Sequence, residues 1–506
     1  MKNLKRFLCL ALCALVLLPL LIACNKGNKG GDEETTTPSD DVVDTGVSTE
    51  TERVFQYDEN GYVMDEIPDT TYDGRKVAII GWKGQERYTI PTQSGNHDLQ
   101  LYAKIYYHRL AIEARLDVQL DVKYITSHGN GGMQSDIVNE LEILLGSGDT
   151  KYDLVQGYSL YPAVMAQRGL LYNINKLQYP DMDMPWWPEE IANWNQYGGL
   201  YYIANGSSTM GLRSMFVLFS NTKMITAEGL TDPVELVIDG KWTVEKMIEY
   251  AKAFNGVATA NPGEMYGFVV DDFSRMDAYY YGAGFQSTVN DANGVASIAL
   301  KDPSYRTRVS DYADILIDFF KRPEVEIALN TTMLMKEKKT AMMSAYMSVI
   351  EGMPDNEYAA LPIPKIDEDA RHYTMQTNGY DMWAIPKNST QPDLAGIVIE
   401  AFASSEYRNI APYYFETVLK DRYAQDTKGM QVFDIIRNSI VYDFGRSCQF
   451  AFTKGTVEGL WRNCFSTSRL KDPKNSLESG WANKGELMEI ELMQIQKNLR
   501  NNSRDN

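Results

Sequence analysis

Cysteine, histidine and long apolar runs are scarce in this chain of 506 residues, which has only five cysteines and four histidines. Three of the cysteines fall in the first 24 residues, which leaves Cys448 and Cys464 in the body of the chain. No Cys-x-x-Cys pair and no Cys/His cluster is present, so we expect no structural zinc site and no cofactor. Cys448 and Cys464 could form one disulfide or could be two small buried apolar side chains, and the sequence leaves both open.

Motifs of the common catalytic sites are also missing. His97, His108, His128 and His372 form no His-Glu-x-x-His helix, and the chain has neither a Gly-x-Ser-x-Gly elbow nor a Gly-x-x-x-x-Gly-Lys-Ser/Thr phosphate loop. The sequence therefore predicts a protein that is not an enzyme. A glycan-acting hydrolase stays open as an alternative, because the carboxylate separation that glycoside hydrolysis needs cannot be recognised from sequence.

Positive charge is in short supply. The chain has 68 acidic and 49 basic residues, which gives a formal net charge of −19 at pH 7. Nucleic-acid binding depends mainly on the neutralisation of phosphates by lysine and arginine, and anionic membrane surfaces attract basic segments. The charge balance thus argues against nucleic acid and against an anionic membrane surface as partners.

The start of the chain has the pattern of a targeting segment. A basic start precedes an apolar run over residues 7–22, which is short for a membrane span and leads into Leu21-Ile22-Ala23-Cys24. This ending resembles the bacterial lipobox, in which a signal peptide is removed before a cysteine that then carries a lipid anchor of diacylglycerol and palmitate. We therefore expect a lipoprotein signal peptide over residues 1–23, lipidation of Cys24, and a location at the extracytoplasmic face of the cell membrane. Residues 24–52 have almost no apolar side chains and are expected to form a disordered tether.

The folded body begins near residue 73 with strand and helix patterns in alternation. Strands are predicted over residues 76–80, 115–124 and 152–156, and helices over 99–115 and 162–167, with a further helix between them that carries Ile137, Leu141 and Leu144 at helical spacing. His108 falls on the apolar stripe of its helix and is expected to be buried. Gly169 is placed to end the short helix before it. This alternation is typical of a doubly wound α/β lobe with a mainly parallel sheet.

The rest of the chain also mixes both patterns. Strands are predicted over residues 200–204, 215–221, 340–345 and 381–385, and helices over 307–320, 333–338, 393–404 and 485–499. Thr243 is placed to cap a helix, and Glu245 suits the positive start of that helix.

Aromatic side chains recur where strands are expected to end. Trp82, Tyr158, Tyr280, Tyr346 and Trp383 all fall in predicted loops at strand ends, which is where small ligands usually bind in α/β proteins. Aromatic faces stack on the C–H faces of sugar rings, while neighbouring Asp, Asn and Arg side chains bond the hydroxyl groups. Each ring taken alone could equally be part of the core, but the repeated placement favours a carbohydrate site.

Several short motifs follow one another in a defined order over about residues 74–470. They are Asp153 with Gly169-Leu170-Leu171, Asn221 with Glu228-Gly229-Leu230, Gly240-Lys241-Trp242-Thr243, Lys338-Lys339-Thr340-Ala341-Met342, and Pro362-Ile363-Pro364 followed by Asn378-Gly379. In this order they resemble the extracellular solute-binding proteins, family 1, of carbohydrate ABC transporters, the group that includes maltose-binding protein. The Gly-Lys-Trp-Thr motif is the most specific of these matches, whereas Lys339 stands where the family pattern has glycine.

The resemblance implies an α/β fold of the two-lobed, periplasmic-binding-protein-like kind (type II), in which each lobe is a mainly parallel sheet flanked by helices and hinge crossings join the lobes. Lobe 1 would comprise residues 73–203 and 377–410, and lobe 2 residues 204–376 and 411–506. Crossings are expected near residues 204–205, 376–379 and 407–412. The ligand contacts that the resemblance implies come from Trp82, Lys83, Tyr158, Tyr346, Tyr380 and Trp461.

Together these features predict a lipid-anchored substrate-binding protein of an ABC importer, which captures a mono- or oligosaccharide between two lobes and delivers it to membrane permease subunits. It is expected to act as a monomer. The sequence leaves open two alternatives, a secreted glycan-acting hydrolase and a surface-binding lipoprotein without a role in transport.

Overall fold

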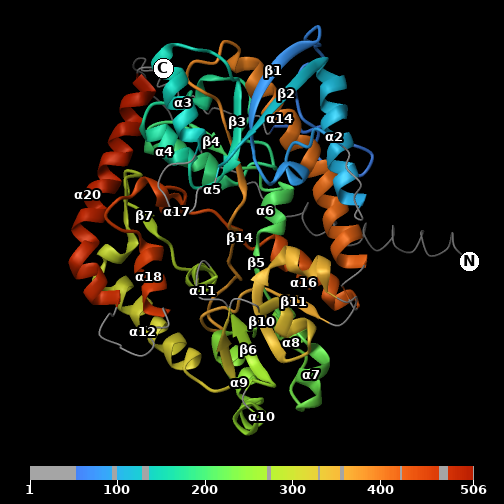
Figure 1. Ribbon diagram of the computed structural model, residues 1–506, viewed down its shortest axis with the longest axis vertical. Helices are drawn as coiled ribbons and strands as arrows, with labels where there is room; N and C mark the ends of the chain where they lie inside the picture. The colour runs from blue at the N-terminus through green and yellow to red at the C-terminus, as the bar shows by residue number, and fades with distance from the viewer. Residues whose placement is uncertain are drawn as a thin grey trace, which may run out of the picture. The chain divides into compact units, whose positions relative to one another are not determined.

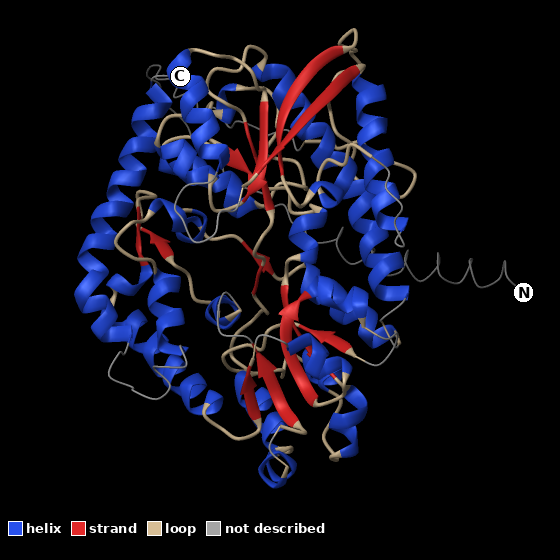
Figure 2. Ribbon diagram, in the orientation of Figure 1, coloured by secondary structure: helices blue, strands red, loops and turns tan. Residues whose placement is uncertain are grey.

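The part of the chain that the structure describes contains two five-stranded sheets flanked by helices (Figures 1 and 2). This computed structural model describes residues 53–93, 100–127, 136–261, 263–270, 275–328, 331–353, 358–421, 424, 426–465 and 477–504. The expected signal peptide over 1–23, the lipidation site Cys24 and the tether over 24–52 lie outside these residues. Within the described residues, no helix combines the length and the apolar character needed to cross a bilayer.

The first sheet has the strand order β2-β1-β3-β13-β4. β1 pairs in parallel with β2 and β3, whereas β13 pairs antiparallel with β3 and β4, so β13 alone runs against the other strands of this sheet. β3 is buried along its whole length, as expected of a strand that is covered on both faces. The strands are β1 (Arg75–Trp82), β2 (Val118–Ile125), β3 (Leu154–Tyr158), β4 (Tyr202–Ile203) and β13 (Asp381–Ala384).

The second sheet has the order β11-β5-β10-β6-β9 and the same kind of direction pattern. β6 pairs in parallel with β10 and β9, whereas β5 pairs antiparallel with β10 and β11. β5 therefore runs against the other strands. The strands are β5 (Phe216–Ser220), β6 (Tyr266–Val270), β9 (Val325–Ile327), β10 (Thr340–Tyr346) and β11 (Ala359–Leu361).

The reversed strand in each sheet follows from the way the chain passes between the sheets. Residues 204–215 lead from β4 of the first sheet into β5 of the second, and residues 375–380 lead into β13 of the first. A strand that starts from a crossing begins at the space between the sheets, where β1, β3 and β10 end, so it must run opposite to them. Both sheets are thus mainly parallel, and this arrangement in two lobes confirms the expected fold class.

The two crossing segments are hydrogen-bonded to each other. Met215 and Thr377 form an antiparallel bridge, and the Asn378 backbone N–H donates to the Ser214 carbonyl at 3.0 Å. The Thr377 hydroxyl donates to the Gly211 carbonyl at 2.7 Å. A third segment lies beside them, because β12 (Met375–Gln376) pairs in parallel with β14 (Ile440–Val441). The joint between the sheets is therefore a bonded unit and not a single loose linker.

Helices pack on both sheets. α2 contacts β2 and α14, while α9, α12 and α13 contact strands of the second sheet. The helix over residues 392–405 continues through π-helical turns, η7 (Glu406–Ile410) and η8 (Tyr413–Lys420), toward α16, which packs on β11. The helices are α2 (Gln100–Leu116), α3 (Asp136–Ser147), α4 (Pro162–Gln167), α5 (Glu189–Ala192), α6 (Thr209–Arg213), α7 (Thr222–Ala227), α8 (Pro233–Ile238), α9 (Val244–Lys252), α10 (Asn255–Ala260), α11 (Met276–Gly282), α12 (Pro303–Phe320), α13 (Thr331–Lys336), α14 (Pro392–Ser405), α16 (Thr427–Arg437), α17 (Phe444–Ser447), α18 (Val457–Phe465) and α20 (Leu477–Arg504), and a small hairpin joins β7 (Thr288–Asn290) to β8 (Ala296–Ile298).

Local sequence signals correctly placed the strands of the first sheet, β5 and β10 of the second sheet and several of the helices, whereas β6, β9 and β11 of the second sheet were not predicted. The Thr243 hydroxyl caps α9 by accepting from the Lys246 backbone N–H at 3.3 Å. Gly169 follows α4 with φ of 72°, the left-handed conformation that glycine adopts without strain. His108 is buried on the apolar stripe of α2, as expected. The C-terminal helix is longer than predicted, because its polar first turns are held against α12 by Arg306, which donates to Glu478 at 2.8 Å.

α20 lies along both halves of the molecule (Figure 1). Near its end, the Tyr201 hydroxyl donates to the Leu499 carbonyl at 2.8 Å, and Asn502 donates to the Ala166 carbonyl at 2.7 Å. A Cβ atom added to Gly198 would lie 2.6 Å from the Arg500 backbone nitrogen, so only glycine permits this close approach. One helix is therefore bonded both to α12, beside the second sheet, and to the segments around β4 of the first.

A buried carboxyl group ties the loop before α5 to α14. Glu400 is fully buried, and its Oε2 accepts from the Asp181 backbone N–H and from Trp187 Nε1, both at 3.1 Å. Burial raises the pKa of Glu400 to about 8, and the Trp187 bond opposes that rise in part. In the unfolded chain this group titrates near pH 4.5, so at intermediate pH only the folded state keeps its proton.

We therefore expect Glu400 to make the protein less stable as the pH rises from 5 to 8. Between pH 4.5 and the folded pKa, folding takes up a proton, so the stabilisation that is fully present below pH 4.5 is lost progressively as the pH rises toward about 8. Glu400→Gln keeps the shape but cannot titrate, so its free energy of unfolding should fall less between pH 5 and pH 8, as measured by urea denaturation. The same pH dependence in both proteins would contradict this assignment.

Candidate functional site

The main candidate site is a cavity of about 410 Å³ between the two sheets. It is bounded by the ends of β1, β3 and β10 and by both crossing segments, so each half of the molecule supplies part of the wall. A cavity at the carboxyl ends of parallel strands is the usual ligand site of α/β proteins. Its lining residues are Trp82, Gln85, Tyr88, Tyr158, Met210, Arg213, Ser214, Tyr346, Ser348, Asn378 and Gly379.

Three aromatic rings at strand ends line the cavity. Trp82 ends β1 and Tyr158 ends β3, and the parallel register brings their ring centroids to 5.4 Å. Tyr346 ends β10 in the other sheet and stacks on Phe216 with centroids 4.7 Å apart. The sheet registers thus bring two rings from one sheet and one from the other to the same space.

The side chain of Asn378 joins the tyrosines of the two sheets. Its Oδ1 accepts from the Tyr158 hydroxyl at 3.2 Å, and its Nδ2 donates to the Tyr346 hydroxyl at 3.1 Å. Burial raises the pKa of Tyr158 to about 12, so this hydroxyl keeps its proton at neutral pH. The crossing segment itself therefore supplies the polar link across the floor of the cavity.

Arg213 is the charged side chain among the lining residues. Its Nε and Nη2 each donate to Glu351 at 2.9 Å, which is the two-pronged pairing that a guanidinium makes with a carboxylate. Its guanidinium carbon also lies 3.8 Å from the centroid of the Tyr88 ring. Tyr88 belongs to the loop after β1 and Glu351 to the segment after β10, so Arg213 contacts both halves of the molecule from α6.

Three of the site residues expected from sequence lie in this cavity, namely Trp82, Tyr158 and Tyr346. Gly379 is also in the wall, but the adjacent Tyr380 is buried with its ring 5.5 Å from Tyr442. Lys83 is exposed beside Trp82 and is not among the lining residues.

The other expected residues are in the core. Tyr280 lies within α11 and Trp383 within β13, so the prediction that both occupy loops at strand ends is wrong. The Trp383 ring packs against the Phe402 ring with centroids 5.4 Å apart, and the rings of Tyr280 and Trp461 pack against each other with centroids 5.5 Å apart. Trp461 is fully buried and donates from Nε1 to the Met276 carbonyl. Their apolar surface is used in packing between elements, which sequence spacing could not distinguish from a ligand surface.

Sequence reasoning missed Arg213, Tyr88 and Gln85 as residues of the wall. Arg213 follows a helix-capping serine, Ser208, whose hydroxyl accepts from the Gly211 N–H at 3.2 Å. That cap is a local signal for a short helix inside the first crossing segment. The contact of Arg213 with Tyr88 depends on tertiary structure, and no sequence signal indicates it.

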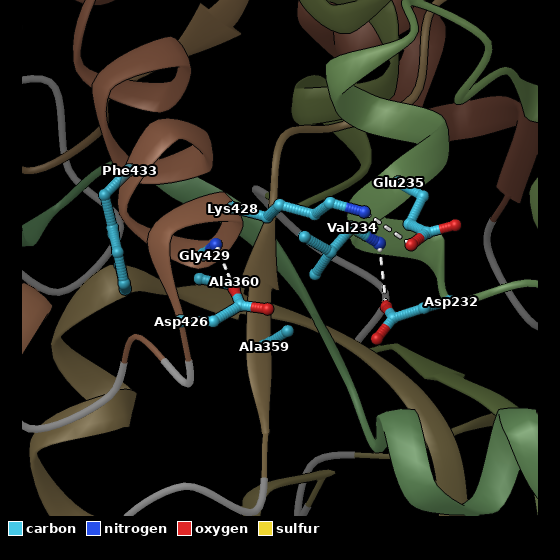
Figure 3. A pocket seen from close by; sticks show the side chains of 9 residues that line it. All are labelled: Asp232, Val234, Glu235, Ala359, Ala360, Asp426, Lys428, Gly429 and Phe433. Atoms are coloured by element: carbon cyan, nitrogen blue, oxygen red, sulfur yellow. Dashed lines mark hydrogen bonds and ion pairs between the residues drawn. The ribbon is translucent and has the colours of Figure 1, made fainter.

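Two other cavities are weaker candidates. One of about 390 Å³ lies between α5 and β7, but Tyr197 there is bonded to Asn290 at 2.7 Å and stacked on Phe444 at 3.8 Å, so a face of its ring is already covered. The other, of about 60 Å³, lies between α8, α16 and β11 (Figure 3). Figure 3 shows Asp232 and Asp426 capping their helices and Lys428 paired with Glu235. The Lys428 Nζ donates to Glu235 Oε1 at 2.6 Å, so the polar groups of this cavity serve the local structure.

Metal and disulfide chemistry find no support in the described part of the chain. No group of three or more His, Cys, Asp or Glu side chains there could hold a metal ion. Cys448 and Cys464 are both buried and are not joined in a disulfide, and burial raises the pKa of the Cys448 thiol to about 12. His97 and His128 lie outside the described residues.

Comparison with protein families gives one match. The model of the bacterial extracellular solute-binding proteins matches residues 112–409, which is more than half of the chain. A search of the curated proteins gives no match.

Solved structures with a similar fold include sugar-binding proteins of ABC transporters. The GacH receptor of Streptomyces glaucescens, solved unliganded and with acarbose, shares 14% identity with a TM-score of 0.52, covering 83% of this chain and 99% of that one. The lacto-N-biose-binding protein of Bifidobacterium longum shares 14% identity with a TM-score of 0.52, covering 84% and 98%. A cyclo/maltodextrin-binding protein complexed with maltotetraose shares 14% identity with a TM-score of 0.54, covering 83% and 98%. At this identity the likeness establishes the fold.

Proposed function

The chain belongs to the bacterial extracellular solute-binding protein family, and on that basis we propose that it binds a mono- or oligosaccharide in the cavity between its two lobes. The observation that carries the proposal is the composition of that wall, in which Trp82, Tyr158 and Tyr346 surround hydrogen-bonding amide and hydroxyl groups. Aromatic faces and amides are suited to the C–H faces and the hydroxyl groups of sugars. The sugar ligands of the structurally similar proteins support the same class.

We further propose that the protein delivers its ligand to the permease of an ABC importer after the lobes close around it. Residues 73–203 with 377–410 would form one lobe, and residues 204–376 with 411–506 the other, a division that the membership of the two sheets supports. The lipid anchor at Cys24, the extracytoplasmic location and the monomeric state are part of this proposal. No covalent step is involved, so the ligand is released unchanged.

A thermal-shift screen of the purified protein tests the ligand class. The panel contains maltotetraose, acarbose, lacto-N-biose and mannobiose, with a tripeptide series as control. A saccharide present at about 100 times its dissociation constant should add about 2.7 kcal/mol to the free energy of unfolding, which raises the melting temperature. A melting temperature raised by the peptides and by none of the saccharides would contradict the carbohydrate assignment. Consumption of the sugar, measured by chromatography, would favour a hydrolase.

Trp82→Ala should weaken binding of the saccharide found in this screen by about 1–3 kcal/mol, because a well-packed aromatic contact at a binding site is lost. Isothermal titration calorimetry measures this change. Trp481→Ala is the matched control, because Trp481 is a partly buried tryptophan on α20 that is not among the cavity residues. The guanidinium carbon of Arg306 lies 5.5 Å from the centroid of its ring. Equal losses in both variants would remove Trp82 from the site.

Cys24→Ser should release the protein from the membrane, because serine has no thiol to carry the diacylglycerol. Cell fractionation with labelled palmitate should find the wild-type protein labelled in the membrane fraction and the variant unlabelled in the soluble fraction. A variant that stays on the membrane would show that another segment anchors the chain.

A further inference from the structure

A buried guanidinium outside the cavity holds the amide on which the cavity tyrosines depend. Arg446, in α17, has a side chain that is only 5% exposed. Its Nη1 donates to Asp277 Oδ2 at 2.6 Å, and its Nη2 donates to Asn378 Oδ1 at 2.8 Å. The Gln376 side-chain amide accepts from Arg446 Nε at 2.8 Å once its oxygen and nitrogen are exchanged, which is the orientation that satisfies both ends of the amide. Gln376 and Asn378 are two residues apart in an extended segment, so they face the same side.

The direction of the bonds in the cavity depends on which end of the Asn378 amide faces which tyrosine. One end of an amide only accepts and the other only donates, whereas a tyrosine hydroxyl can do either. Tyr158 and Tyr346 would therefore tolerate both orientations of the amide. A guanidinium has donors and no acceptor, so it requires the oxygen of Asn378 to face it.

We propose that Arg446 is a positioning residue for the cavity, which fixes the Asn378 amide and thereby the direction of the hydrogen bonds made by Tyr158 and Tyr346. With Oδ1 held toward Arg446, Tyr158 donates its proton to that oxygen and keeps its lone pairs as acceptors. Nδ2 donates to Tyr346, which directs the Tyr346 proton to a group other than Asn378. Two hydroxyls from opposite sheets thus have opposite roles at one amide.

This pair of roles suits a ligand hydroxyl better than a ligand carboxylate. A ligand hydroxyl both accepts and donates, so it can accept from the Tyr346 hydroxyl and donate to the Tyr158 hydroxyl. A carboxylate only accepts, so it could not donate to Tyr158. The statement about the ligand rests on the proposed function, but the orientation of the amide does not, and it can be measured without any sugar.

Lysine cannot replace Arg446 in this role. It preserves the positive charge opposite Asp277, but its single nitrogen lacks the planar fork that reaches three acceptors in fixed directions. Arg462 provides a matched control, because it donates from Nε to the same carboxylate, Asp277 Oδ1, at 2.7 Å and has no bond to Asn378. Arg446→Lys and Arg462→Lys therefore each remove one guanidinium from Asp277, and only the first removes one from the amide.

The test is the hydrogen-exchange rate of the Asn378 side-chain amide in ligand-free, ¹⁵N-asparagine-labelled protein, with Asn378→Asp identifying the resonance. Loss of a bond to a charged group should make exchange about tenfold to a hundredfold faster in Arg446→Lys. The rate in Arg462→Lys should stay at the wild-type value. An unchanged rate in Arg446→Lys, or an equal increase in both variants, would overturn the proposal.

A measurement on the wild-type chain keeps the proposal testable if Arg446→Lys does not fold. Nuclear Overhauser contacts from the Asn378 NH₂ protons should reach the Tyr346 ring, and the Tyr158 ring and the Arg446 guanidinium should show weaker contacts. The reverse pattern would show that the amide has the opposite orientation. Failure of the saccharide screen would contradict the proposed function and leave both of these readouts unaffected.

Discussion

The structure depends on the hydrogen-bonded pairing of its two crossing segments, residues 204–215 and 375–380. The Met215–Thr377 bridge and the bond from the Asn378 N–H to the Ser214 carbonyl fix where the chain leaves one sheet and enters the other. Because each crossing continues as the reversed strand of a sheet, the carboxyl ends of the remaining strands lie at the space between the sheets. The cavity, its aromatic rings and its polar floor are all consequences of this arrangement.

Buried charges are concentrated around that joint. Asp277 is fully buried and pairs with both Arg446 and Arg462, and Arg213 pairs with Glu351 through two bonds. Removing such charges from water costs several kcal/mol for each ion, and their attraction repays this cost only when the geometry is good. In this protein these ion pairs fix orientations, because a guanidinium with donors in fixed directions determines how the groups bonded to it are turned. The pairs connect α11, α17, α18 and the crossing segment, so they hold the floor of the cavity in one arrangement.

Sequence reasoning located part of the candidate site because strand ends follow a simple rule. Parallel strands end at one edge of a sheet, so the rings that end β1 and β3, Trp82 and Tyr158, meet there, and Tyr346, which ends β10, lines the same cavity from the other sheet. The rule did not apply to Tyr280 and Trp383, because both lie inside regular elements and have their rings covered by neighbours. Whether an aromatic ring faces a cavity or a core depends on what packs against it, and short apolar runs do not contain that information.

By itself, the sequence determined the local structure and the fold class. Apolar periodicity placed many of the helices and strands, Thr243 and Gly169 marked helix boundaries, and the order of the first elements indicated one mainly parallel α/β lobe, while the second lobe was implied by the family resemblance. Only the tertiary structure decided which polar groups meet. Arg446 binds Asn378, 68 residues away, and Asp277, 169 residues away. Hydrogen bonds depend on distance and angle in space, whereas periodicity reports only which side of an element is buried.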